Sequence, residues 1–333
     1  RILTDFIMHH LKASFIGKNS FWRYLVMIAS VLIISNTLGA LPLLIAYSVR
    51  AASDPDVVSG LAENPADISI LGLDPNVSLI LMLFPFLAGL IAFSLMVKPL
   101  NGRTLALTIN GNRKFRWDRF FISALVWFIL SAIYLVIYLK VNPSNFTITN
   151  TSVTLVFLVI ISVVFVPFQA AFEEVLFRGY LMQGFTTLAG NKWIPLLMTS
   201  LLFGLMHSFN PEVDEFGFLT MMPQYFIFGL VFGIVTIMDD GIEAAIGAHS
   251  ANNIFLCIMV THDSSALQTQ AVFTQHNVYP WTEFTALVIS GIIFITALKM
   301  IFRWGDFSGL AGRVDRPGSD DQSPYTDVLS SLR

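Results

Sequence analysis

Charged residues are scarce in this sequence. Asp, Glu, Lys and Arg make up 12% of the 333 residues, against about 25% in typical soluble domains. The net charge of -3 is small and no basic segment is interleaved with aromatic residues, so nucleic acid is not an expected partner. Apolar residues take the place of charge, because 55% of the chain is hydrophobic. This composition is typical of an integral membrane protein whose immediate partner is lipid.

Cysteine and the common hydrolase motifs are missing or nearly so. The single cysteine, Cys257, excludes an internal disulfide and a metal site built from several thiolates. The chain has no His-Glu-x-x-His zinc motif and no Gly-x-Ser-Gly nucleophile segment. Asp239 and Asp240 are adjacent but lack the sequence context of an aspartyl protease. Any chemistry must therefore depend on other residues.

Long apolar stretches dominate what is present. A helix that crosses a bilayer needs about 20 mostly apolar residues. Eight stretches of the chain are candidates, of which the fifth is short. They are residues 24–48, 77–97, 118–139, 153–176, 194–208, 219–238, 242–260 and 281–302. The sequence therefore predicts an all-α, polytopic membrane protein with about eight transmembrane helices. Asn36 and Pro42 predict a kink in the first stretch, and the fourth is expected to continue past Arg178 towards Leu188.

Basic residues gather in alternate connecting segments, which predicts the orientation of the chain. The other loops carry almost only Arg50 and Lys140 as basic residues. The positive-inside rule then places both termini in the cytoplasm, with an even number of crossings. The basic residues on the predicted cytoplasmic side are Arg1, Lys12, Lys18, Arg23, Lys98, Arg103, Arg113, Lys114, Arg116, Lys192, Lys299, Arg303, Arg313 and Arg316.

The same features divide the chain into four segments. Residues 1–23 form an N-terminal cytoplasmic or interfacial segment, and residues 24–145 hold three accessory spans. Residues 146–304 form the membrane core that contains the polar motifs, and residues 305–333, rich in Gly, Ser, Asp and Pro, predict a disordered cytoplasmic tail. In residues 1–20, helix-like spacing predicts either an interfacial helix or an extension of the first span; the apolar positions are Ile2, Leu3, Phe6, Ile7, Leu11, Phe15 and Ile16.

Three of the apolar stretches contain ionisable or amide side chains at helical spacing. Such groups are costly in hydrocarbon unless they are paired or face a wet cavity, so they are functional by default. We therefore expect a polar site inside the bundle, formed by Glu173, Glu174, Arg178, His207, His249 and Asn253. The remaining histidines lie in terminal or loop segments, without matching polar partners nearby in sequence: His9, His10, His262 and His276.

The two adjacent carboxylates are expected to differ in role. Glu174 and Arg178 are four residues apart, so they share one helix face and can form an ion pair. Glu173 is rotated by about 100° from Glu174 and faces elsewhere. One carboxylate is thus predicted to be structural and the other free to react. The alternative is that both carboxylates share Arg178 as a packing device.

The histidines supply complementary chemistry. His207 closes the fifth stretch and could accept a proton or bind a metal, unless it is merely a hydrogen-bonded interior residue. His249 and Asn253 are four residues apart and offer N–H donors of the kind that stabilise a developing oxyanion. Their alternative role is interhelical hydrogen bonding. Asn252 is three residues from His249, so spacing does not decide between Asn252 and Asn253.

Together these groups suit the hydrolysis of an amide bond. A carboxylate and an imidazole can activate water, while the N–H donors hold the tetrahedral oxyanion. A glutamate and two histidines can also bind zinc, which makes Glu173, His207 and His249 the candidate ligands if the protein is a metalloenzyme. Straight helices would place Glu173 near the inner face and His207 roughly 20 Å from that face. Tilt, a break near Pro167 or a later start of the fifth helix must bring these two together.

The ordered motifs resemble those of the CAAX protease and bacteriocin-processing family, also called the CPBP or Abi family. A eukaryotic relative is the Ras-converting enzyme, a type II CAAX prenyl endopeptidase. The family pattern is Glu-Glu-x-x-x-Arg, Phe-x-x-x-His and His-x-x-x-Asn or Asp, each on its own membrane helix. The matching positions here, within about residues 150–260, are Glu173, Glu174, Arg178, Phe203, His207, His249 and Asn253.

The resemblance implies an intramembrane endopeptidase acting on a membrane-associated peptide or protein, which can be lipidated. By it, Glu173 and His207 activate water, Glu174 pairs with Arg178, and His249 with Asn253 stabilises the oxyanion. The family has been described both as a metalloprotease and as a metal-independent glutamate protease, so a divalent metal such as zinc stays an open cofactor. The competing hypotheses are a catalytically idle scaffold or immunity member and a proton- or cation-coupled transporter.

Overall fold

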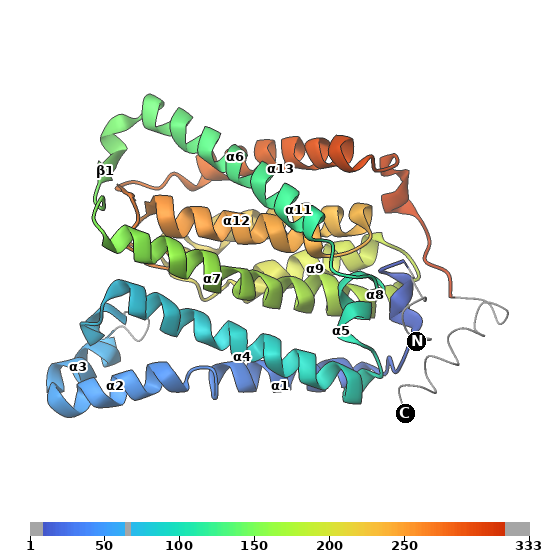
Figure 1. The fold of residues 1–333 in the computed structure, drawn as a ribbon, viewed down its shortest axis with the longest axis horizontal. Helices are drawn as coiled ribbons and strands as arrows, with labels where there is room; N and C mark the ends of the chain where they lie inside the picture. Colours follow the sequence, from blue (N-terminus) through green and yellow to red (C-terminus); the bar gives the residue numbers. More distant parts are fainter. Residues whose placement is uncertain (1–8, 64–67, 317–333) are drawn as a thin grey trace.

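The computed structural model describes residues 9–63 and 68–316, and it places a helix at each of the eight expected positions (Figure 1). The polytopic, all-α architecture predicted from the sequence is confirmed. The main helices are α1 (Phe21–Asn36) with α2 (Leu41–Ser53), α4 (Pro75–Asn101), α6 (Trp117–Val141), α7 (Thr154–Glu174), α9 (Trp193–Met206), α11 (Phe218–Asp239), α12 (Glu243–Met259) and α13 (Pro280–Phe302).

Six helices in the described part of the chain are long and apolar enough to cross a bilayer. The expected count of about eight full crossings is therefore reduced, because α9 has 14 residues and α12 has 17. Both are shorter than the roughly 20 residues that a span needs. They are also the helices that position the two histidines of the site, since His207 directly follows α9 and His249 lies within α12.

The kink expected in the first span is present. The chain leaves helical geometry after α1 and resumes at α2, which has Pro42 in its first turn. Next to this break, the Ser35 hydroxyl donates to the carbonyl of Pro85 on α4 at 2.6 Å. The two halves of the span therefore pack against α4 as one bent element (Figure 1).

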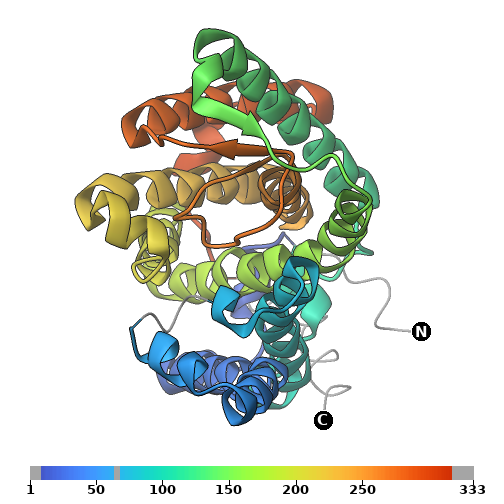
Figure 2. The ribbon, with the colours of Figure 1, turned by 90° about the vertical axis from the view of Figure 1, so that its left-hand side faces the viewer.

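Helix α7 lies between α4 and α12, with α6 packed on the far side of α12 (Figures 1 and 2). Glycines permit the closest approaches. A Cβ atom at Gly89 of α4 would lie 2.6 Å from the ring of Phe172 on α7, and one at Gly247 of α12 would clash with the Phe120 carbonyl of α6. Small residues of this kind allow helices to pack closely in membranes. This packing brings α6, α7 and α12 together around the polar residues.

The short elements lie mostly at the ends of the bundle. A three-stranded sheet closes one end, which we call the sheet end (Figure 2). Its order is β1-β3-β2, with β1 antiparallel and β2 parallel to β3. The short elements are η2 (Lys12–Phe15), α3 (Pro55–Glu63), η3 (Ile68–Leu71), α5 (Leu105–Asn110), η4 (Pro143–Asn145), β1 (Phe146–Ile148), α8 (Met182–Ala189), α10 (Pro211–Phe216), β2 (Val260–Thr261), β3 (Phe273–Gln275) and η6 (Phe307–Ala311).

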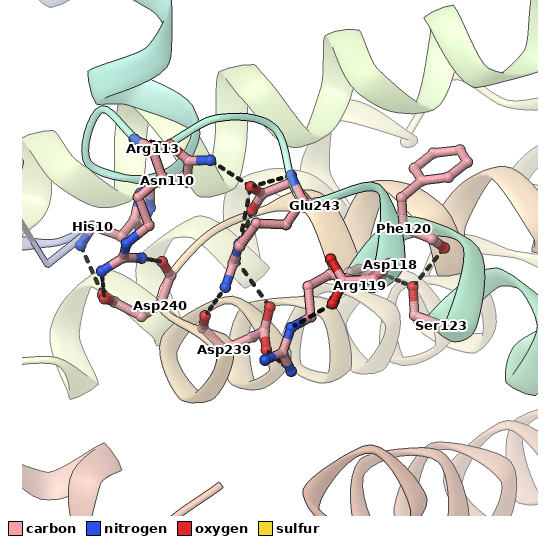
Figure 3. A network of polar contacts seen from close by, with 12 residues as sticks. His10, Asn110, Arg113, Asp118, Arg119, Phe120, Ser123, Asp239, Asp240 and Glu243 are labelled. Atoms are coloured by element: carbon pink, nitrogen blue, oxygen red, sulfur yellow. Dashed lines mark hydrogen bonds and ion pairs between the residues drawn. The ribbon is translucent and has the colours of Figure 1, made fainter. Parts of the chain in front are cut away.

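A cluster of ion pairs joins the opposite end, which we call the ionic end (Figure 3). Arg116 contacts Glu243 at 2.6 Å and Asp239 at 3.0 Å. Arg119 contacts Asp239 at 3.1 Å. These pairs connect the start of α6 to the turn between α11 and α12. The ionic cluster consists of Arg113, Arg116, Arg119, Asp239, Asp240 and Glu243.

Asp240 lies in the turn of this cluster and anchors the N-terminal segment. It pairs with Arg113 at 2.6 Å and accepts a hydrogen bond from the backbone N–H of His10 at 2.7 Å. Burial alone would raise the pKa of Asp240, but these two donors outweigh it and hold that pKa below its usual range. The carboxylate therefore stays ionised and keeps residues 9–16 against the ionic end.

The terminal segments are more ordered than expected where the structure describes them. Residues 9–16 pack against the ionic end with His10, Ala13 and Ser14 fully buried, and they contain the short turn η2, which is separate from α1 and so does not extend the first span. Within the predicted disordered tail, residues 305–316 are ordered, because Leu310 and Val314 pack against apolar residues of α8, α9 and α11. Residues 1–8 and 317–333, which complete both predictions, lie outside the described residues.

Candidate active site

The fourth span continues as helix far beyond the Glu-Glu pair, as expected. It runs without interruption over residues 154–189. Its central part, Val175–Leu181, is a π-helix, and all seven of its residues are buried. Segments of this type are rare and occur often at functional sites. Glu173 and Glu174 end the α-helical part, and Arg178 lies within the π-helix.

Glu174 and Arg178 form the predicted ion pair. Arg178 Nη1 donates to Glu174 Oε1 at 2.9 Å, and both side chains are fully buried. The same oxygen also contacts His249 Nδ1 at 2.8 Å. Arg178 Nη2 donates to the Gly229 carbonyl at 3.3 Å. Glu174 thereby connects α7 to α12, while Arg178 connects the π-helix to α11.

Glu173 has different surroundings, and it does not share Arg178 in a hydrogen bond. Its Oε1 atom accepts a hydrogen bond from Gln169 Nε2 at 2.6 Å. Its Oε2 atom has no hydrogen-bond partner among the described residues and lies 3.7 Å from His249 Nε2. Glu174 Oε2 also lacks a partner, but Glu174 is sealed in the protein whereas Glu173 lines a cavity. Glu173 is thus the carboxylate that a ligand can reach.

His207 follows the last turn of α9 and lines the same cavity. Its Nδ1 atom lies 2.7 Å from the Phe203 carbonyl, which can only accept, so Nδ1 carries the proton. In the neutral ring, Nε2 therefore holds a lone pair and can accept a proton. The ring stacks on Tyr225, with 4.4 Å between centroids, and this contact fixes its plane.

Phe203 lies between the two histidines. Its ring centroid is 4.6 Å from that of His207 and 6.0 Å from that of His249. The Arg178 guanidinium lies over the same ring, at 4.2 Å from its centroid. Such a cation–π contact is favourable in a desolvated site. The phenylalanine of the Phe-x-x-x-His motif therefore contacts both histidines and helps to hold Arg178.

The helix lengths explain how Glu173 and His207 reach the same cavity. Glu173 lies 16 residues before Ala189, where the long helix ends, and His207 lies 14 residues after Trp193, where α9 begins. At about 1.5 Å per residue these distances are roughly 24 Å and 21 Å from the ionic end. The separation of roughly 20 Å that straight helices would give is therefore not present, because the helix extends well beyond Glu173.

Asn252 and Asn253 both line the cavity, and Asn253 is the one connected to Glu173. Asn253 Nδ2 donates to Gln169 Oε1 at 2.8 Å, and Gln169 in turn donates to Glu173. Asn252 donates from Nδ2 to Asn253 Oδ1 at 2.9 Å. Its Oδ1 atom accepts a hydrogen bond from Trp127 Nε1 at 3.1 Å. Sequence reasoning missed Gln169 and Trp127. Gln169 could have been found, since it lies four residues before Glu173 on the same helix face.

The cavity has a volume of about 520 Å³ and extends from His249 to Gln275 and Glu283 at the sheet end. Aromatic residues from six helices line it, among them Phe86, Trp127, Tyr225 and Phe232. No lysine or arginine belongs to the described residues of its lining. A largely apolar cavity with a few convergent polar groups is the usual form of a ligand site.

The proposed zinc ligands do not fit a metal ion in this arrangement. No group of three His, Cys, Asp or Glu side chains within residues 9–63 and 68–316 is placed to hold one. His249 directs Nδ1 to Glu174, and His207 directs Nδ1 to a backbone carbonyl. We therefore assign no step of the chemistry to a metal.

Comparison with known proteins agrees with these motifs. The family described as "Type II CAAX prenyl endopeptidase Rce1-like" matches residues 152–255. The uncharacterized protein YyaK of Bacillus subtilis (strain 168) is 30% identical over 250 residues, which cover 75% of this chain and 81% of that protein. No solved structure matches.

The chain belongs to this Rce1-like CAAX endopeptidase family, and the resemblance seen in its motifs is confirmed. It is an integral, multi-pass membrane protein, as its six spanning helices also indicate. Membership of the family supports a CAAX-type protease activity in the membrane.

Proposed function

We propose that this protein is an intramembrane endopeptidase in which Glu173 and His207 activate water. The observation that carries the proposal is the state of Glu173. It is 8% exposed, lines the cavity and keeps one carboxylate oxygen without a hydrogen-bond partner among the described residues. A buried polar atom without a partner is costly. A water molecule that enters the cavity satisfies this oxygen and becomes the nucleophile.

Water activation uses two acceptors in the cavity. Glu173 Oε2 and the lone pair on His207 Nε2 accept the protons of the water while its oxygen attacks the peptide carbonyl carbon. One proton passes to these groups and is later delivered to the nitrogen of the leaving amine. The C–N bond then breaks and yields a carboxylic acid, which keeps the second proton of the water, and an amine.

The oxyanion of the tetrahedral intermediate needs N–H donors. With Nδ1 donating to Glu174, the Nε2 atom of His249 carries a proton only when the ring is an imidazolium. That charge balances the two carboxylates and the one guanidinium of the site cluster, which consists of Glu173, Glu174, Arg178 and His249. The second amide proton of Asn253 is the other donor. Preorganised donors of this kind account for much of the rate of acyl transfer.

The substrate in this proposal is a membrane-associated peptide or protein, which can carry a lipid. The apolar lining of the cavity suits such a segment. Both termini of the protein lie in the cytoplasm in this proposal, because the basic residues of the ionic end favour that side. The proposed core of residues 146–304 carries the chemistry, and the helices of residues 24–145 support it from one side.

The test is cleavage of a quenched fluorescent peptide library by the purified protein in detergent. We expect Glu173→Gln to lower kcat by about 10³-fold, within the range for loss of a general base. Glu215→Gln is the matched control, since Glu215 is exposed on α10 and does not line the cavity. Wild-type cleavage by Glu173→Gln would overturn the mechanism. An inactive wild type, with Glu173→Gln equally inactive, would support the scaffold or transporter hypothesis instead.

A further inference from the structure

We propose that Gln169, Asn252 and Trp127 form a positioning relay that orients both Glu173 and Asn253. The inference rests on the proposed function and adds residues that the family motifs do not contain. The relay crosses three helices, from Trp127 on α6 through the two asparagines on α12 to Gln169 and Glu173 on α7. Its four hydrogen bonds measure 3.1, 2.9, 2.8 and 2.6 Å in that order.

The two ends of the relay fix the direction of every bond in it. An indole N–H can only donate, and an ionised carboxylate can only accept. Each amide between them must therefore turn its oxygen towards Trp127 and its nitrogen towards Glu173. Amide groups often have two acceptable orientations. Here the end groups remove that freedom for Asn252, Asn253 and Gln169.

The first consequence concerns which oxygen of Glu173 reacts. Gln169 occupies Oε1, so Oε2 alone is left for water. Gln169 lies one helical turn before Glu173 and is only 7% exposed, so most of its side chain is held by packing in the protein. The relay thus selects a single oxygen as the proton acceptor and holds it towards the cavity.

The second consequence concerns the oxyanion donor. One amide proton of Asn253 is committed to Gln169 Oε1, which stops the amide from rotating. The remaining proton then has a fixed direction. Chains of hydrogen bonds also polarise one another, so the indole donor at the far end strengthens this N–H as a donor. The base and the oxyanion donor are in this way held by the same glutamine.

The structure offers variants that remove relay bonds with little change in volume. Trp127 is 3% exposed and packs against Phe294 and Phe232, with ring centroids at 4.9 and 5.6 Å. Trp127→Phe keeps an aromatic ring in that cluster and deletes the N–H donor together with part of the ring volume. Gln169→Met keeps the length of the side chain and deletes both the amide oxygen and the amide nitrogen. Gln268→Met is the matched control, because Gln268 is exposed, lies outside the cavity lining and bonds to the Asp263 carbonyl.

The experiment measures kcat and KM separately for peptide cleavage in detergent. We expect Gln169→Met to lower kcat by about 10- to 100-fold, as for other residues that orient a reactive group. Trp127→Phe should lower kcat by about 5-fold, as for loss of one neutral hydrogen bond. KM should change by less than about 2-fold in both, because neither residue contributes a bond to the substrate. Gln268→Met should leave kcat unchanged.

The double variant decides whether the residues act as one chain. If they do, adding Trp127→Phe to Gln169→Met causes no further loss, because the relay is already broken. Additive losses, or a wild-type kcat in Gln169→Met, would overturn the relay. That result is distinguishable from failure of the proposed function, since Glu173→Gln would still be inactive. If Gln169→Met does not fold, Trp127→Phe alone still tests the proposal.

Discussion

The site cluster and the ionic cluster use the same side chains with different charge balance. At the ionic end three guanidinium groups face three carboxylates. In the site cluster two carboxylates face one guanidinium, and His249 lies beside both of them. The ionic cluster holds equal numbers of guanidinium and carboxylate groups. The site cluster holds one carboxylate more than it has guanidinium groups, and the neighbour of that carboxylate is an imidazole, a side chain that can exchange protons in catalysis.

This difference separates the charged residues that stabilise the fold from those that can take part in a reaction. Matched ion pairs fix the turn between α11 and α12, and nothing in them is available for reaction. The excess negative charge of the site cluster lies next to a cavity. Loss of a residue from the ionic cluster should therefore affect stability, whereas loss of Glu173 should affect catalysis.

The largest effect we expect separates the two adjacent glutamates. Glu173→Gln should lower kcat by about 10³-fold without lowering the melting temperature, because its Oε2 has no protein partner to lose. Glu174→Gln should destabilise the fold by about 3–5 kcal/mol, because it leaves Arg178 buried without its counter-charge. Thermal melting and cleavage assays in detergent measure both. Equal melting temperatures for the two variants would remove the distinction between them.

The second prediction concerns the ionic cluster. Arg116→Met should cost about 3 kcal/mol of stability, because Glu243 is fully buried and Asp239 nearly so, and both lose a partner. The kcat of the protein that remains folded should be unchanged. Arg303→Met, at the end of α13, is the control for loss of one positive charge. A kcat that falls with Arg116→Met as far as with Glu173→Gln would show that the clusters are not separate.

The third prediction concerns pH and His10. Burial lowers the pKa of His10, so the native protein keeps this ring neutral. The unfolded chain binds a proton at the ordinary histidine pKa of about 6.5. The stability linked to His10 is therefore present above that pH and is lost as the pH falls below it. Melting temperatures at pH 7.5 and 5.5 should converge in His10→Gln relative to wild type. The same pH dependence in both proteins would contradict this role.

The smallest effect we expect is that of metal removal. Since the described residues do not form a three-ligand group, a zinc chelator should leave kcat within about 2-fold of its starting value. The assay adds chelator to the purified protein and then an excess of zinc. Loss of activity that zinc restores would give Glu173, His207 and His249 the role of ligands. The difference between the site cluster and the ionic cluster would then be the binding of a metal ion.

Local spacing predicted the features that depend on one helix. The i,i+4 rule placed Glu174 with Arg178, and the break at Asn36 and Pro42 followed from helix chemistry. Hydropathy found every main helix. It marked the stretch of α9 as short but did not predict the short length of α12, because an apolar run does not reveal where a helix starts within it.

Features that join distant parts of the chain could not be predicted in this way. His10 bonds to the backbone of Arg178, 168 residues away, and to Asp240, 230 residues away. No local pattern marks such pairs. In the sequence, Trp127 looks like an ordinary packing residue of an apolar helix. Only the structure shows that its N–H donates to Asn252. The π-helix has seven residues, too few for its period to be separated from that of an α-helix.

The hydrogen bond between His10 and the π-helix fixes the register of that helix. His10 Nε2 contacts the Arg178 carbonyl at 3.0 Å, and Gln183, one turn further, donates to the carbonyls of His10 and Leu107 at 2.9 Å each. If the π-helix relaxed to α geometry, everything after it would turn by about 100°. Gln183 would then leave both carbonyls. The N-terminal segment thus holds one extra residue in the helix and keeps Arg178 aligned with Glu174.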